Sequence, residues 1–177
     1  MKIIELPKKV TSLLEHYEAP QRLIRHLTIV HATAFYLSEQ LNNTWQQLPF
    51  NIAEILFGAA THDIGKVIVT DEIYQEGKLH EVKGFALLKQ HGFSDSEARF
   101  TITHGNWKAE TNMLEDLIVC LADKVWKGKR IPELEEEIVK RISTTIYVDF
   151  WEVFMQFEAI LEKIVIGADD RIAWQGI

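Results

Sequence analysis

Apolar residues that recur at helical spacing are the feature that most constrains the fold of this chain. Between Pro20 and about Asn42 they fall three or four residues apart, which places them on one face of a helix. No segment shows a strong alternation of apolar and polar residues, the pattern that indicates a half-buried strand. The sequence therefore predicts an all-α fold, and helix-start and helix-stop residues divide it into about eight helices.

The predicted helices are short to medium in length and leave one long stretch, residues 65–77, as a loop. Their approximate bounds are 6–17, 20–42, 51–63, 81–90, 94–104, 112–127, 133–143 and 148–166. A chain of 177 residues is long enough to bury a core, and we expect one domain over residues 1–177.

Charge and cysteine content exclude several classes of protein. The net charge of −7 argues against attraction of the whole surface to nucleic acid or to an anionic membrane. Cys120 has no second cysteine to pair with, which excludes an internal disulfide and fits a reducing compartment. No apolar run reaches the roughly 18–20 residues of a membrane helix. We expect a cytoplasmic protein that binds neither membrane nor nucleic acid.

The dipeptide His62-Asp63 is the first candidate for chemistry. It ends an apolar run that begins at Ile52, and Gly65 follows it as a helix-stop residue. An imidazole and a carboxylate at one helix end can hold the same cation. Imidazole suits Zn, Fe, Mn or Ni, and the carboxylate adds a hard oxygen ligand.

Four further residues are candidates to complete a metal site. His26 lies on the apolar face of the predicted helix 20–42, and Asp123 lies inside an apolar run, where a buried carboxylate needs a cation or strong donors. His80 and His104 stand at predicted helix ends. Each has an ordinary alternative: His26 as a core histidine, Asp123 as an ion-pair partner of a basic residue, the other two as exposed residues. A helical bundle could bring them together.

His31 competes with His26 for the role of first ligand. The two are five residues apart, which is about 140° around a helix, so both cannot easily face one metal. We choose His26 because it shares its face with Val30, and we keep His31 as the reserve. His16 and His91 are interpreted as structural or surface residues.

These residues carry a resemblance to the HD superfamily of metal-dependent phosphohydrolases. It rests on three segments in the family's order: residues 22–30 around His26, residues 62–66 with His-Asp, and residues 121–124 around Asp123. His80 and His104 resemble the additional ligands of its two-metal branches, such as the HD-GYP phosphodiesterases and the bacterial hydrolases of symmetrical dinucleoside tetraphosphates. Residues 121–130 also resemble a bacterial branch of HD-domain proteins. No GYP motif follows position 84, which argues against hydrolysis of cyclic di-GMP.

The resemblance implies an HD-domain helical bundle with a core over about residues 20–130 and a C-terminal helical extension over 131–177. It implies one or two divalent metal ions, drawn from Fe, Mn, Zn, Ni and Mg. The implied ligands are His26, His62, Asp63 and Asp123 for the first ion, and His80 and His104 for the second, with Asp63 as the bridge.

The resemblance further implies a phosphohydrolase that uses metal-activated water on a nucleotide or another small phosphate ester. Asp63 and Lys66 would then be catalytic, and the expected phosphate-binding residues are Lys66, Lys124, Lys127 and Arg130. The alternative function is a non-catalytic HD-like module that binds a nucleotide or a partner around a structural metal. The aromatic residues Trp151, Phe154 and Phe157 also leave two alternatives open, a homodimer interface or packing on the domain's own core.

Overall fold

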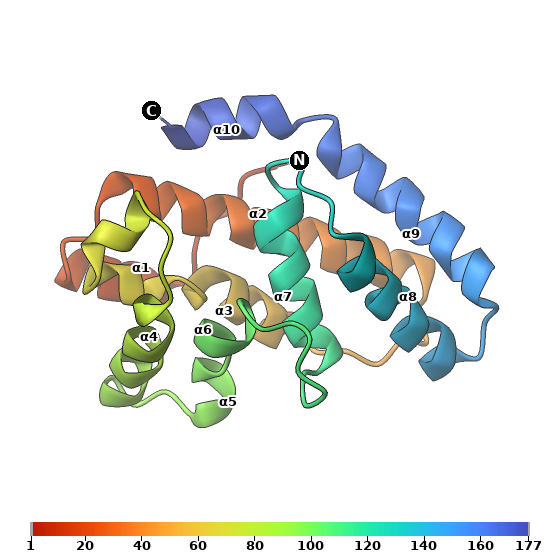
Figure 1. Ribbon diagram of the computed structural model, residues 1–177, viewed down its shortest axis with the longest axis horizontal. Coiled ribbons are helices and arrows are strands. Elements are labelled where there is room, and N and C mark those ends of the chain that lie inside the picture. Colours follow the sequence, from red (N-terminus) through yellow and green to blue (C-terminus); the bar gives the residue numbers. More distant parts are fainter. Residues whose placement is uncertain (1, 177) are drawn as a thin grey trace.

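The structure is a computed structural model that describes residues 2–176, so both ends of the predicted span 1–177 lie outside the described residues. In chain order the helices are α1 (Lys8–His16), α2 (Gln21–Thr44), α3 (Ile52–Thr61), α4 (Leu79–Gln90), α5 (Asp95–Ala98), α6 (Phe100–Thr103), α7 (Leu114–Val125), α8 (Pro132–Ile146), α9 (Phe150–Val165) and α10 (Ala168–Gly176) (Figure 1). Two short 3-10 helices, η1 (Ile64–Val67) and η2 (Thr70–Ile73), connect α3 to α4.

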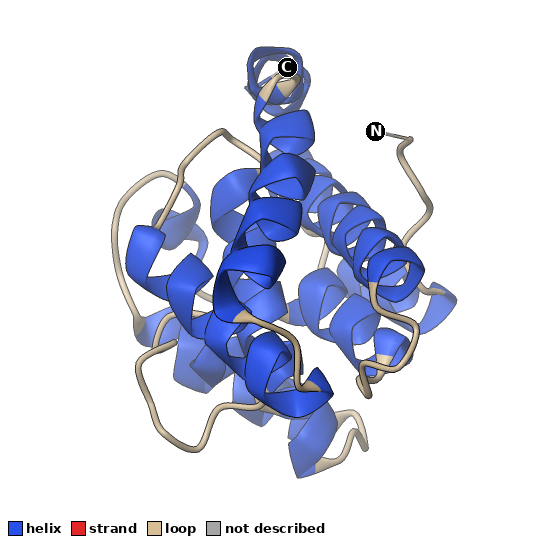
Figure 2. Cartoon of the chain, turned by 90° about the vertical axis from the view of Figure 1, so that its right-hand side faces the viewer, coloured by secondary structure: helices blue, strands red, loops and turns tan. Residues whose placement is uncertain are grey.

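The all-α prediction is confirmed, because residues 2–176 contain helices and loops but no strand (Figure 2). The helix number differs from the expected eight in two places. The predicted helix 94–104 is interrupted at Arg99 and becomes α5 and α6. Helix α10 was not predicted. Within the part of the chain that the structure describes, no helix is both long enough and apolar enough to cross a membrane.

The main core lies where α2, α3 and α7 pack against one another. The apolar stripe predicted for the second helix is buried in full, and its members are Leu23, Leu27, Val30, Ala34, Leu37 and Leu41. Ile55 and Ala59 from α3 and Leu117 and Leu121 from α7 meet this stripe. Burial of these side chains fixes the three helices that carry His26, His62 and Asp123.

Of the C-terminal helices, α8 and α9 pack against α7 and against each other, and α9 also contacts α2. Phe157 on α9 is buried in that core, as the second of the two alternatives for the aromatic residues predicts. Trp151 is 68% exposed and packs its edge against Phe154 at a ring-centroid distance of 5.8 Å. A homodimer through this helix stays a prediction.

Gly65 allows η1 to approach α4 closely. A Cβ atom at this position would lie 2.0 Å from the backbone oxygen of His80 and 2.5 Å from the backbone nitrogen of Gly84. Real Cβ contacts of this length do not occur, so a side chain here would push the backbones apart. Gly65, which we predicted to end a helix, therefore also allows the close approach of Asp63 to His80.

The substitution Gly65→Ala should lower the free energy of unfolding by about 1–3 kcal/mol, because the added methyl group overpacks two backbone segments. Urea denaturation measures the change. Gly176→Ala is the matched control, because nothing lies within 4 Å of the Cβ position there. Equal stability of the two variants would contradict the close approach.

Candidate metal centre

His62 and Asp63 lie at the junction where α3 ends and η1 begins. Nδ1 of His62 donates a hydrogen bond to the backbone oxygen of Ala59, one turn earlier, over 3.0 Å. This bond leaves the Nε2 lone pair free and directs it away from the helix. Both side chains are buried, with exposed fractions of 0% for His62 and 3% for Asp63.

One cluster of candidate ligands joins three helices. Nε2 of His26 on α2 lies 3.1 Å from Nε2 of His62 and 3.3 Å from Oδ1 of Asp123 on α7. The same carboxylate oxygen lies 3.6 Å from Nε2 of His62. The three ligand atoms could therefore hold one metal ion.

A second cluster lies on the other side of Asp63. Oδ1 of Asp63 lies 3.0 Å from Nε2 of His80, in the first turn of α4, and 3.5 Å from Nε2 of His104, which follows α6. Nδ1 of His104 donates to the backbone oxygen of Phe100 over 3.0 Å, so its Nε2 is also free to bind a metal. These three ligand atoms could hold another ion.

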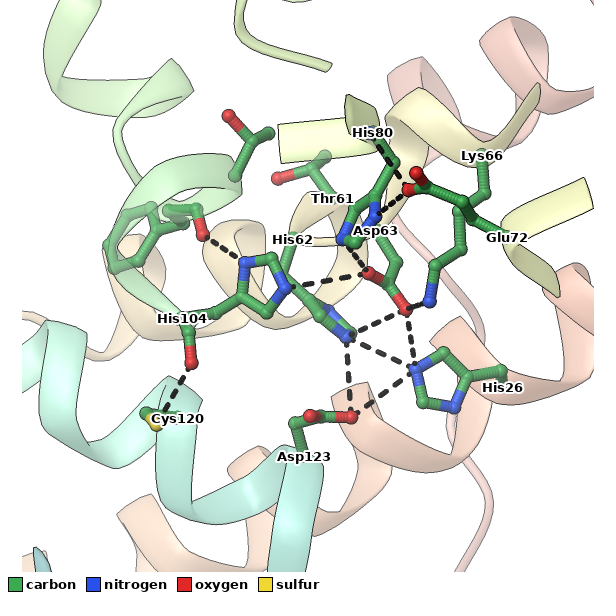
Figure 3. A network of polar contacts seen from close by, with 12 residues as sticks. His26, Thr61, His62, Asp63, Lys66, Glu72, His80, His104, Cys120 and Asp123 are labelled. Atoms are coloured by element: carbon green, nitrogen blue, oxygen red, sulfur yellow. Dashed lines mark hydrogen bonds and ion pairs between the residues drawn. The ribbon is translucent and has the colours of Figure 1, made fainter. Parts of the chain in front are cut away.

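Asp63 stands between the two clusters and offers one oxygen to each (Figure 3). Oδ1 faces His80 and His104, as above, whereas Oδ2 lies 3.1 Å from Nε2 of His26 and 3.6 Å from Nε2 of His62. A carboxylate can bridge two cations in this way, because each of its oxygens carries lone pairs. The family resemblance implied that Asp63 bridges two metal ions, and the geometry is compatible with this role.

The protonation states of the buried carboxylates and of His62 favour the binding of cations. Burial acts to raise the pKa of Asp63, but the neighbouring imidazoles, His62 first among them, outweigh it and hold that pKa well below its usual range. The pKa of Asp123 is lowered likewise, against the effect of burial, chiefly by the neighbouring imidazoles of His26 and His62. Burial lowers the pKa of His62 and favours its neutral form. Two buried carboxylates are thus anionic beside a neutral imidazole.

Two buried atoms at the centre have no hydrogen bond within the described residues, namely Oδ1 of Asp63 and Nε2 of His80. They lie 3.0 Å apart, but their orientation does not satisfy a hydrogen bond. Unpaired buried polar atoms are costly unless another group satisfies them. Four imidazoles and two carboxylates with free lone pairs fit divalent Zn, Fe, Mn or Ni.

Two predicted phosphate-binding lysines lie beside this centre. Nζ of Lys66 lies 2.6 Å from Oδ2 of Asp63, and Nζ of Lys124 lies 2.5 Å from Oδ2 of Asp123. Burial acts to lower the pKa of Lys124, but the Asp123 charge outweighs it and raises that pKa. Both ammonium groups are therefore close to the position that a molecule bound at the centre would occupy.

Arg130 lies apart from these lysines, so its predicted phosphate contact gains no support from the structure and stays a prediction. Its guanidinium donates to Glu135 at 2.9 and 2.7 Å and to Glu158 at 3.0 and 2.5 Å. Two carboxylates therefore already occupy its donors, and Arg130 lines neither hollow beside the centre. It ties α8 to α9 instead.

Two adjoining hollows open onto the centre and share five lining residues, which are His26, Asp63, Lys66, Ile73 and Lys127. The larger has a volume of about 520 Å³ and also contains Asp123, Lys124, His80 and His104 in its wall. The other, of about 470 Å³, extends toward α10. Volumes of this size suit a small organic ligand.

The structure separates His26 from the other histidines considered. His31 is buried on α2 outside both clusters, and burial lowers its pKa to about 4. His91 accepts or donates a hydrogen bond with the hydroxyl of Tyr17 over 2.9 Å, away from the centre. The choice of His26 over His31 thus agrees with the geometry.

Glu72 is a residue of the centre that sequence reasoning missed. Its Oε2 accepts from Nδ1 of His80 at 2.5 Å and from the backbone nitrogen of the same residue at 3.0 Å, while Oε1 accepts from the nitrogen of Leu79. One carboxylate thus caps α4 and orients its histidine. No sequence pattern pointed to Glu72; in the structure Gly77 lies against its carboxylate, where a Cβ would be 2.2 Å from Oε1.

The comparisons with known proteins give one match. A sequence model described as HD domain matches residues 23–127, and this range includes all six candidate metal ligands. The search of curated proteins and the search of solved structures found no match.

Replacing Glu72 with glutamine should weaken binding of a second cation about 10- to 100-fold, because His80 loses the carboxylate that orients its ring. Calorimetric titration with Mn²⁺ separates the two binding events and measures each affinity. Glu39→Gln, an exposed change at a residue that lines neither hollow, is the control. If Glu72→Gln binds two ions as tightly as the control does, Glu72 has no positioning role.

Proposed function

Because the chain belongs to the HD domain family, we propose that it is a metal-dependent phosphohydrolase that acts on small phosphate esters, including nucleotides. The superfamily is one of metal-dependent phosphohydrolases, and the activity and substrate of this chain are our inference. The proposal requires a cation site, groups that bind phosphate, and room for a substrate. Each requirement has a counterpart among the described residues.

The observation that carries the proposal is the position of Asp63. Its two oxygens face separate groups of imidazoles, with Oδ2 at 3.1 Å from His26 and Oδ1 at 3.0 Å from His80. A closed structural site would bury a single ion among four ligands, whereas this arrangement lies at the wall of a hollow. It therefore favours a reaction centre over a structural metal.

The histidines and aspartates would bind the cations, and the lysines would bind the phosphate. His26, His62 and Asp123 would hold one divalent cation, His80 and His104 a second, and Asp63 would contact both. Such cations neutralise charge on a phosphoryl group and lower the pKa of water. Lys66 and Lys124 now pair with carboxylates at 2.6 and 2.5 Å, and each can turn its ammonium toward a phosphate oxygen as a point charge. Lys127 lines both hollows and adds a third positive charge.

One observation favours the alternative, a binding module without catalysis. The ammonium groups of Lys66 and Lys124 already partly neutralise Asp63 and Asp123, so the cluster could persist with fewer cations than a hydrolase needs. Such a module would bind a phosphorylated ligand in the same hollow and release it unchanged. Binding without turnover separates the two functions.

Asp63→Asn should lower the rate of phosphate release by more than about 100-fold, since it removes the charge that both cations share. The assay follows Mn²⁺-dependent hydrolysis of 4-nitrophenyl phosphate and of a panel of nucleoside phosphates. Asp95→Asn is the matched control, because the Asp95 side chain is 80% exposed and pairs with Lys89 at the surface.

Full activity in Asp63→Asn would contradict the assignment of this residue. Ligand binding by the unmodified protein without hydrolysis of any ester, under any cation tested, would instead support the binding module.

A further inference from the structure

Helix α10 forms part of the wall of the smaller hollow. Ile172 and Gln175 line it together with His26, Asp63 and Lys66 from the metal centre. Figure 1 shows α10 beside α2, and the two helices are in contact. Because α10 lies beyond the matched range 23–127, this wall is a feature of the chain outside its HD domain match.

Contacts with α2 and with the residue after α7 fix the position of α10, and these two helices carry the candidate ligands His26 and Asp123. Nε of Arg171 donates to the backbone oxygen of Trp126, just after α7, over 2.6 Å. At the other end the guanidinium of Arg25, next to His26 on α2, lies 5.5 Å from the ring centroid of Trp174 and donates to its backbone oxygen over 3.2 Å. These contacts hold Ile172, which lies between the two anchors, over the hollow.

The smaller hollow is lined by cationic residues and by apolar residues. Lys66, Lys127 and Lys129 contribute positive charge, whereas Leu23, Ile73 and Ile172 contribute apolar surface. Ile172 is 44% exposed, so a ligand in the hollow could cover it and gain from the burial. This combination suits a phosphate ester whose organic group is apolar rather than a small hydrophilic one.

We propose that α10 is the specificity-determining wall of the substrate site, and that Ile172 contacts the apolar organic group of the substrate. The proposal rests on the proposed function for the phosphate end of the ligand. The amide of Gln175 lies on the same wall and can exchange hydrogen bonds with a polar edge of that group. Selection among phosphate esters would then depend on residues outside the range matched by the family.

The test uses two probes that cannot be hydrolysed, phenylphosphonate and methylphosphonate, so that binding is measured without turnover. Calorimetry in the presence of Mn²⁺ gives the dissociation constant of each probe for the unmodified protein and for Ile172→Ala. We expect the unmodified protein to bind phenylphosphonate at least about ten-fold more tightly, and Ile172→Ala to reduce this preference about five-fold. Ile166→Ala, an identical change at a residue that is 86% exposed and outside the hollow, should leave the preference unchanged.

The outcomes separate this proposal from the proposed function. Equal affinity for the two probes, or a preference that Ile172→Ala leaves intact, would overturn the role of α10 even if the protein hydrolyses phosphate esters. A preference that depends on Ile172 in a protein that hydrolyses none of the esters would uphold the wall and reject the hydrolase.

Discussion

The buried negative charge of Asp63 is the constraint on which the site depends. Placing a carboxylate in a protein interior is costly unless cations or strong donors surround it. Imidazoles from four segments of the chain converge on it, together with the ammonium of Lys66. Three of these rings have their second nitrogen held by a carbonyl or a carboxylate, which turns the free lone pair inward. The buried negative charge and the free imidazole lone pairs fit divalent cations.

The helices that hold these groups are fixed by ordinary packing. The interfaces among α2, α3 and α7 bury long apolar side chains, and the ligands stand at one end of these interfaces. Shorter segments complete the centre: η1 and η2 bring Asp63 and Glu72 against α4, and Gly65 lets the backbones meet. A rigid core thus carries the first cluster, and a more local set of turns carries the second.

Much of the fold and the grouping of the site residues could be predicted from sequence, because they rest on local patterns. The spacing of apolar residues located α2 and its buried stripe, and the His-Asp pair with its superfamily resemblance singled out the six residues that the structure brings together. Features that depend on long-range contacts could not be predicted. Glu72 lies in a segment without periodicity, and α10 is held by Arg25 and Arg171 through bonds to distant parts of the chain. The two carboxylate partners of Arg130 could not be predicted either, because the run of basic residues around it does not reveal them.

The most direct test of the shared carboxylate is the number of divalent ions bound per chain in protein purified without chelator, measured by elemental analysis. If Asp63 bridges the two histidine clusters, the unmodified protein should carry two ions per chain, and Asp63→Ala should lose both together. A single ion or none in the unmodified protein, under every loading condition, would contradict the bridge.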